Sequence, residues 1–436
     1  MTHIVETIPD EILELIFNDC CNTNLFSIAD DYIMSSLGDL PALTVSSVCL
    51  QWRRVGLSSS RIWSRISLEH WGDYSFTEDR RLEYRLSTVL KTFISRSRQQ
   101  PLVLSICFDD SPTPDIWRPY EPLAILCSEY QRWSSFTFQS ATWFVDAFPT
   151  LVDLHLPLDE NLSFLNVRAP RLQRLTINSC NGTLSELTAL RSLDVDDFDE
   201  SGDGYDLIWL SILYDDFKTV PPTACPSIEA LNVRHHENGT SDSIFPFLTL
   251  PSLKTLCLDC GQEFVERQYL WRSFNPFMGF VKRSSFPLTT LCIKGVAFSD
   301  SRLIYLLYHI PTLLDLAVMD PIVIDGEKRQ SLHVGTGSLL QPATPLVPRL
   351  RCLTLSVGEC LFTATEASDL VKSRLTNGSQ FGVDCLQSLT IVFRGRMKVP
   401  KAYDALNGFK KDGIKITILC SNSATEFFLS TRTEYQ

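Results

Sequence analysis

The chain has 436 residues, of which 44% are hydrophobic and 21% charged, a composition typical of globular proteins with room for two or three domains. Its 39 basic and 51 acidic residues give a net charge of −12, which repels phosphate and argues against nucleic-acid or anionic-membrane binding. The N-terminal sequence lacks the basic start and apolar run of an export signal, so we expect a cytoplasmic and/or nuclear protein without a transmembrane helix. The 14 cysteines are scattered singly, which predicts free thiols.

The first predicted element is an amphipathic helix near the N-terminus. Pro9 suits a helix start, and Asp10 and Glu11 place negative charge at the positive end of the helix dipole. Apolar side chains recur with the helical period and form one stripe, made of Ile8, Ile12, Leu15 and Ile16. The start signal and the stripe therefore agree, and an apolar stripe of this kind is suited to docking.

A second amphipathic helix is predicted a few tens of residues downstream. Its apolar side chains again share one face, formed by Val45, Val48, Trp52 and Val55. The serines at 58–60 end the helix, and Trp63, Ile66 and Leu68 follow as a short apolar segment.

Three motifs in residues 8–68 together resemble the F-box family: Pro-x-Glu-Ile…Ile-Phe from Pro9, Val-Cys-x-x-Trp-Arg from Val48, and the single Trp63. The resemblance implies a helical domain over residues 1–70 that docks on a Skp-type adaptor and, through it, on a cullin. By position match, it places six residues at or beside this interface, namely Pro9, Ile12, Ile16, Val48, Cys49 and Trp52. The chain departs from the family at Ile8, where Leu is usual, and in the long link Asn18 to Ala42. The alternative is that these apolar residues are only the core of a small helical domain.

Residues 71–130 predict one helix and one strand. Apolar side chains from Leu82 to Ile94 have the helical period, and residues 101–106 alternate as a strand does. We therefore expect the first α/β turn of a solenoid here. The segment Arg96 to Leu102 also resembles the helix-to-strand junction of mushroom-type fungal F-box proteins.

From residue 131 to about 425 the chain repeats the unit Pro-x-Leu-x-x-Leu-x-apolar, at intervals of about 20 to 40 residues. Its copies lie at 149–156, 170–177, 190–195, 226–233, 251–258, 288–293, 311–318, 348–355 and 386–391, with an aromatic variant at 133–138. Each unit predicts a short strand whose alternate side chains point inward, and stacked strands form a parallel sheet. The pattern resembles an irregular leucine-rich-repeat solenoid.

The return segments of this α/β repeat predict helices at 299–307 and 363–371. The expected equivalent buried positions are Leu154, Leu175, Leu231, Leu256, Leu291, Leu316 and Leu353. Residues 414–418 alternate as a closing edge strand, and 426–436 are expected to form a tail. The expected fold is thus a helical F-box followed by an α/β solenoid with a parallel sheet.

Candidate chemical sites are few. Cys257 and Cys260 have zinc-type spacing, but no second pair exists and Cys257 lies in a predicted strand, so we expect no metal. His235 and His236 are adjacent on an extended chain and point oppositely. A calcium-like loop from Asp199 has Leu210 where a glutamate is required.

The acidic run Asp194 to Asp206 is interpreted as a solvated loop or, alternatively, as a patch for a basic partner. The chain has no nucleophile-elbow Gly-x-Ser-x-Gly and no phosphate loop. We therefore expect neither a cofactor nor an enzymatic activity.

These observations predict the substrate receptor of a cullin-RING (SCF-type) ubiquitin ligase, in which the repeats bind an unidentified protein client. The alternative is a repeat scaffold that binds proteins outside any ligase. Period-two alternation places several polar side chains on the strand side of the solenoid, and we take them as client-binding candidates: Arg174, Arg234, His235, Lys254, Lys294 and Arg351. Simple solvation of these side chains is the competing interpretation.

Overall fold

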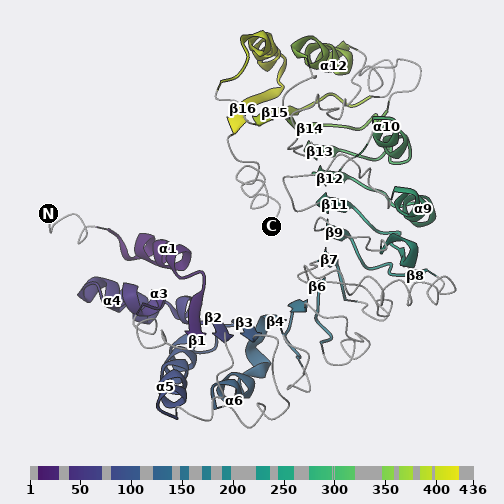
Figure 1. Cartoon of the computed structure of the whole chain (residues 1–436). Coiled ribbons are helices and arrows are strands. Elements are labelled where there is room, and N and C mark those ends of the chain that lie inside the picture. Colours follow the sequence, from purple (N-terminus) through teal and green to yellow (C-terminus); the bar gives the residue numbers. More distant parts are fainter. Residues whose placement is uncertain are drawn as a thin grey trace, which may run out of the picture. The chain divides into compact units, whose positions relative to one another are not determined.

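The computed structural model describes residues 8–28, 39–70, 80–108, 121–139, 148–156, 169–177, 189–197, 222–235, 244–259, 274–296, 298, 300–319, 346–357, 363–376, 383–394 and 398–421. Helices alternate with parallel strands in the first and last parts of the chain, whereas the strands from β4 to β11 follow one another without an α-helix among the described residues (Figure 1). The chain divides into two units, Met1–Leu190 and Arg191–Gln436, and each is described by itself.

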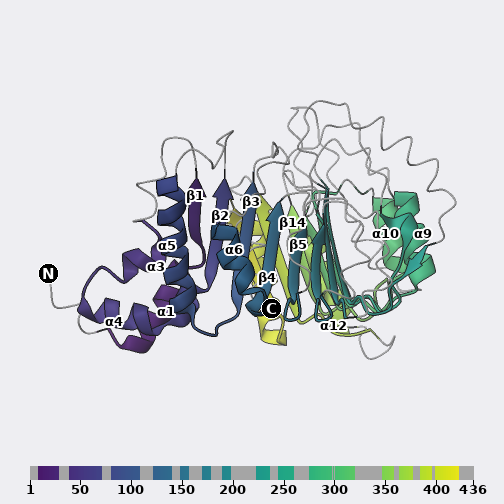
Figure 2. The ribbon, with the colours of Figure 1, turned by 90° about the horizontal axis from the view of Figure 1, so that it is seen from below.

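The first unit builds a parallel sheet whose strands pair in chain order. The strands are β1 Asn24–Ile28, β2 Arg65–His70, β3 Leu102–Phe108, β4 Trp133–Gln139, β5 Asp153–Leu156 and β6 Arg174–Ile177. The helices are α1 Asp10–Cys20, α3 Pro41–Val45, α4 Leu50–Ser58, α5 Arg80–Ser97 and α6 Glu121–Ser128, with 3₁₀ turns η2 Ser60–Trp63 and η4 Tyr130–Arg132. Figure 2 shows α5 and α6 on the same face of the strands, where buried Leu90 and Leu126 help to form the core.

The sheet begins earlier than the sequence predicts. Residues 1–70 were expected to be helical, with the first α/β unit at 82–106, and this expectation is wrong because β1 and β2 precede it. Strand β1 lies in the long link between the two predicted helices, and its Phe26 pairs with Leu68 and is buried. The unusual length of the link is therefore explained by a strand.

The prediction of a single helix over Val45 to Val55 is also wrong. The structure has two helices here, because α3 ends at Val45 and α4 begins at Leu50. Between them Cys49 is extended, and its Sγ accepts a hydrogen bond from the Trp52 amide over 3.5 Å. This thiol caps α4 and lets the chain turn, whereas the apolar period runs through the break unchanged.

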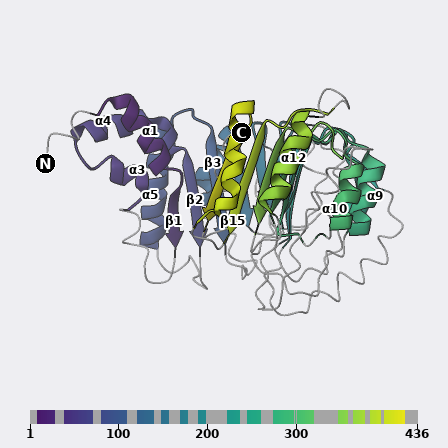
Figure 3. The same cartoon turned by 90° about the horizontal axis from the view of Figure 1, so that it is seen from above.

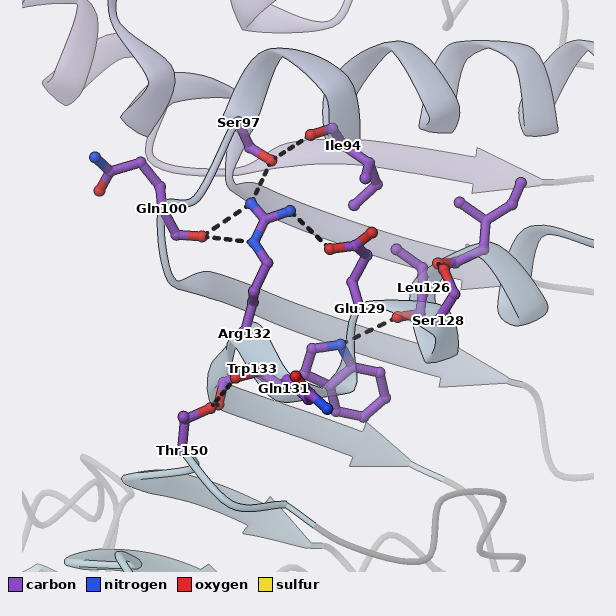
Figure 4. Close-up of polar contacts among 11 residues, drawn as sticks. Ile94, Ser97, Gln100, Leu126, Ser128, Glu129, Gln131, Arg132, Trp133 and Thr150 are labelled. Carbon is purple, nitrogen blue, oxygen red and sulfur yellow. Dashed lines mark hydrogen bonds and ion pairs between the residues drawn. The ribbon is translucent and has the colours of Figure 1, made fainter.

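The helix-to-strand junction after α5 is held by Arg132 (Figure 4). The helix ends at Ser97, and Arg98 adopts a left-handed φ of 53°. The Arg132 guanidinium donates to the Gln100 carbonyl and, over 2.7 Å, to Ser97 Oγ, and it pairs with Glu129 over 2.9 Å. The predicted helix and strand are confirmed, and this polar cluster has a structural role because it caps the carboxyl end of α5.

The second unit confirms the repeat prediction. Its strands pair in parallel in the order β7 Ser192–Asp197, β9 Ala230–His235, β11 Thr255–Asp259, β12 Thr290–Lys294, β13 Asp315–Met319, β14 Cys352–Val357, β15 Ser388–Arg394 and β16 Lys415–Ser421. Two short strands, β8 Thr223–Ala224 and β10 Leu248–Thr249, pair separately. Together with β5 and β6, all nine predicted copies of the unit, and the predicted closing strand, are strands.

Helices lie on one face of this sheet, as Figures 1 and 3 show for α9 Phe274–Ser284, α10 Asp300–Tyr308 and α12 Ala364–Thr376. Two 3₁₀ helices, η7 Phe245–Phe247 and η8 Lys401–Asp412, complete the described elements. The predicted helices at 299–307 and 363–371 correspond to α10 and α12. The leucines expected to be equivalent are in direct register, Leu231 beside Leu256, Leu291, Leu316 and Leu353, and all are buried.

Candidate interaction surfaces

Helix α1 carries apolar side chains on a face that no part of the described chain covers. Ile12 is 47% exposed and Leu15 is 63% exposed, and Ile16 is exposed beside them. These are three of the four residues in the predicted stripe. Because contiguous exposed apolar side chains are uncommon on monomeric proteins, this face has the character of a docking surface rather than of a core.

The opposite face of α1 is the one that forms the core. Leu13 and Phe17 are fully buried, and the Phe17 ring packs edge-on against Trp52 of α4 with centroids 5.0 Å apart. Trp52, predicted at the interface, is therefore half-buried and joins the two helices. The sequence does not distinguish the two apolar faces, since both have the helical period.

The start of α4 adds a second exposed apolar segment. Val48 and Cys49, both predicted at the interface, are exposed, and the neighbouring Leu50 is 86% exposed. Leu50 was missed because it falls outside the predicted stripe. Pro9, also predicted, is exposed and lies at the N-cap of α1.

Polar contacts hold α1 and α4 together at their amino-terminal ends. The Gln51 amide donates to the Ile8 carbonyl over 2.9 Å and to Asp10 over 3.0 Å, and Arg54 pairs with the other Asp10 oxygen over 2.7 Å. The Gln51 hydrogen bond, assisted by Arg54, lowers the pKa of the Asp10 carboxyl from its ordinary value. These contacts fix the two exposed apolar segments relative to each other.

A buried amide attaches this helical segment to the sheet. Asn24 of β1 is fully buried, and its Nδ2 donates to the carbonyls of Ile62 and Arg65, each over 2.8 Å. Its Oδ1 accepts from the amide of Ala42 in the first turn of α3, over 3.0 Å. Asn24 occupies the inward row of the sheet, in register with Ile66, where the other strands carry apolar side chains.

The predicted client-binding side chains lie along the strands, and four of them form ion pairs with neighbouring strands or loops. In the first unit, Arg174 pairs with Asp153 over 3.0 Å. In the second unit the pairs are Lys254 with Glu229 (2.7 Å), Lys294 with Asp259 (3.4 Å) and Arg351 with Asp384 (2.9 Å). The Lys254 ammonium, which donates a hydrogen bond, lowers the pKa of Glu229.

Register places charges of alternating sign next to one another on three neighbouring strands of the second unit, β9, β11 and β12. Arg234 on β9 is opposite Asp259 on β11, which is opposite Lys294 on β12. Arg234 is half-buried, and the side chain of His235 lies outside the described residues. The cross-strand pairing, visible only once the register is known, means that these cations neutralise their neighbours.

The weaker chemical candidates gain no support. Within the described segments, no group of three or more His, Cys, Asp or Glu side chains is placed to hold a metal ion. Cys260, His236 and the calcium-like loop lie outside the described residues, as does the acidic run after Asp197. Asp194, at the start of that run, accepts a hydrogen bond from Asn232 of the next strand.

Comparison with known proteins adds no assignment. No protein-family model matches the chain, and no curated protein matches it. Among the described helices, none has the length and apolar character needed to cross a membrane.

Proposed function

We propose that this chain is an F-box substrate receptor of a cullin-RING (SCF-type) ubiquitin ligase, in which α1, α3 and α4 dock on a Skp-type adaptor and the repeat strands bind a protein client. The observation that supports it best is the exposed apolar surface at the F-box motif positions. Ile12, Ile16 and Val48 are exposed where the resemblance expects contact with an adaptor.

The physical argument for docking is that exposure of these side chains is costly. Each large aliphatic side chain gains about 1.5–3 kcal/mol when it moves from water into an apolar environment. A helix that is apolar on two faces, one packed on Trp52 and one exposed, is suited to lie in the groove of a partner. Residues of a protein core would not be exposed in this way, so the alternative of a mere helical core does not account for Ile12 and Leu15.

The test is a double substitution, Ile12→Asp with Ile16→Asp. Placing two carboxylates in an apolar interface should weaken adaptor binding by about 2 kcal/mol or more, roughly 30-fold. Both positions are exposed, so the fold should persist. Binding is measured by titrating a purified Skp-type adaptor into the full chain.

The control for added surface charge is Tyr308→Asp on α10, which introduces one carboxylate, against two in the test variant, at an exposed aromatic position far along the chain. It should bind the adaptor as the wild type does. If the double variant also binds with wild-type affinity, the docking assignment is wrong.

The client surface proposed for the second unit includes Lys254, Lys294 and Arg351. The ion pairs of Lys254 and Arg351 are partly exposed and are compatible with this role, because exposed pairs contribute only about 0–1 kcal/mol and exchange readily for a client's charges. The Lys294 pair is more buried. Lys254→Glu should reduce client capture from a lysate while adaptor binding persists.

The charge-swapped variant, Lys254→Glu with Glu229→Lys, separates recognition from stability. It restores the ion pair but exchanges the positions of the positive and the negative charge on the surface. If capture recovers fully in the swapped variant, Lys254 supports the fold and does not contact the client.

A further inference from the structure

Two cysteines that are far apart in the sequence are direct neighbours in the sheet. Cys257 of β11 and Cys292 of β12 are register partners on adjacent parallel strands. Buried and half-buried residues alternate on both strands, so the two thiols lie on the face opposite the buried Leu256 and Leu291. Neither cysteine is in a disulfide, and both are half-buried.

The two thiols are in contact. Adjacent strands lie about 4.8 Å apart, which brings register partners close together. A hydrogen bond between the Cys292 thiol and Cys257, together with burial, favours the protonated form and raises the pKa of the Cys292 thiol well above its ordinary value. The Cys292 side chain is therefore favoured as the neutral thiol, which makes it a poor target for simple oxidation, since that needs a thiolate.

The surroundings limit what this dithiol binds. Its neighbours in the same row are Asn232 on β9 and Ala317 on β13, and the Asp259–Lys294 ion pair lies two residues along the strands. The described residues offer no third metal-ligating side chain to form a cluster. A structural zinc ion needs four ligands, which this pair does not supply. Two thiols instead suit a soft, thiophilic atom that forms two bonds to sulfur and already carries its third substituent.

We propose that Cys257 and Cys292 form a dithiol binding site for trivalent organoarsenicals, a class of soft thiophilic ligand. With phenylarsine oxide as the probe, two As–S bonds form and the arsenic–oxygen bond breaks. The oxygen leaves as water with both thiol protons, and arsenic stays trivalent, so no oxidant or reductant is required. The site is independent of the proposed ligase role.

The experiment treats the full chain with phenylarsine oxide and maps the product by digestion and mass spectrometry. A bridge between the peptide containing Cys257 and the peptide containing Cys292 is expected. Cys292→Ala should weaken binding at this site by about a hundredfold or more, since the second sulfur then no longer acts at high effective concentration. Ala317 occupies the equivalent position on β13, so alanine fits there.

Two control variants make the result decisive. Cys260→Ala removes the neighbour that the sequence spacing suggested, and Cys352→Ala removes another half-buried thiol of the same sheet. Both should bind the arsenical as the wild type does. Loss of the Cys257 adduct in Cys260→Ala, or an unchanged adduct in Cys292→Ala, would overturn the proposal.

Discussion

At the scale of single residues, the amide of Asn24 connects helix and sheet in the first unit. It makes three hydrogen bonds, to the carbonyls of Ile62 and Arg65 and to the amide of Ala42. Replacing it by alanine leaves these buried groups unpaired, at a cost of about 1–3 kcal/mol. We expect Asn24→Ala to lower the free energy of unfolding by that amount in a urea titration.

The control for this prediction is Asn22→Ala, because Asn22 is exposed and lies only two residues away. It should change stability by about 0.5 kcal/mol or less. Equal effects of the two substitutions on the free energy of unfolding would contradict the role of Asn24 in attaching the helices to the sheet. The sequence does not predict Asn24, since a polar residue in a long link shows its inward position only when the register of β1 is known.

Gly56 in α4 is a second residue with a specific requirement. A Cβ there would lie 2.6 Å from Ser46 Oγ, which donates to the Ala42 carbonyl. Alanine normally favours a helix over glycine by about 1 kcal/mol, but here the contact opposes it. We expect Gly56→Ala to lower the thermal midpoint and Ser46→Ala to rescue it in the double variant; stabilisation by Gly56→Ala alone would show that the clash is absent.

At the scale of elements, the contact between α1 and α4 should depend on pH. The folded chain holds the pKa of Asp10 below its ordinary 3.8, first through Gln51 and then through Arg54. Its contribution to stability is therefore present above about pH 3.8 and lost as the pH falls through the lower folded value. Thermal unfolding of Asp10→Asn should show a deficit at neutral pH that shrinks toward pH 3; a constant deficit would contradict this linkage.

In the second unit, we expect substitutions on the two faces of a strand to differ strongly in their cost to stability. Leu291 is fully buried between Leu256 and Leu316, whereas Thr290 beside it is half-buried on the opposite face. Leu291→Ala should cost about 2–5 kcal/mol of unfolding free energy, measured by denaturant titration. Thr290→Ala should cost far less. Similar costs for the two substitutions would contradict the assignment of Leu291 to the buried face and Thr290 to the opposite face.

The elements that the sequence predicted are those with a strong local period. All nine Leu-x-x-Leu units became strands, because alternation and spacing both specify them. The break at Cys49 was missed, since the apolar period continues across it. The motif predicted Ile12 and Ile16 as docking candidates, and both are exposed, but the Cys257–Cys292 pair requires cross-strand register, which one sequence does not contain.

At the scale of the whole molecule, each unit contains a stack of parallel strands that pair in chain order, apart from β8 and β10, which pair with each other. The first unit begins with α1, α3 and α4, which hold the exposed apolar surface, and Asn24 ties them to β1 and β2. These helices and the first strands are therefore one structural body. The proposed docking of an adaptor at α1 should leave the strands of this unit unchanged.

The most direct test of the central claim is hydrogen–deuterium exchange of the full chain with and without a purified Skp-type adaptor. We expect a stable complex and protection in residues 9–20 and 41–58, with the repeat strands β7 to β16 unchanged. Failure to form a complex, or protection confined to the repeat strands, would contradict the assignment of α1, α3 and α4 as the docking surface.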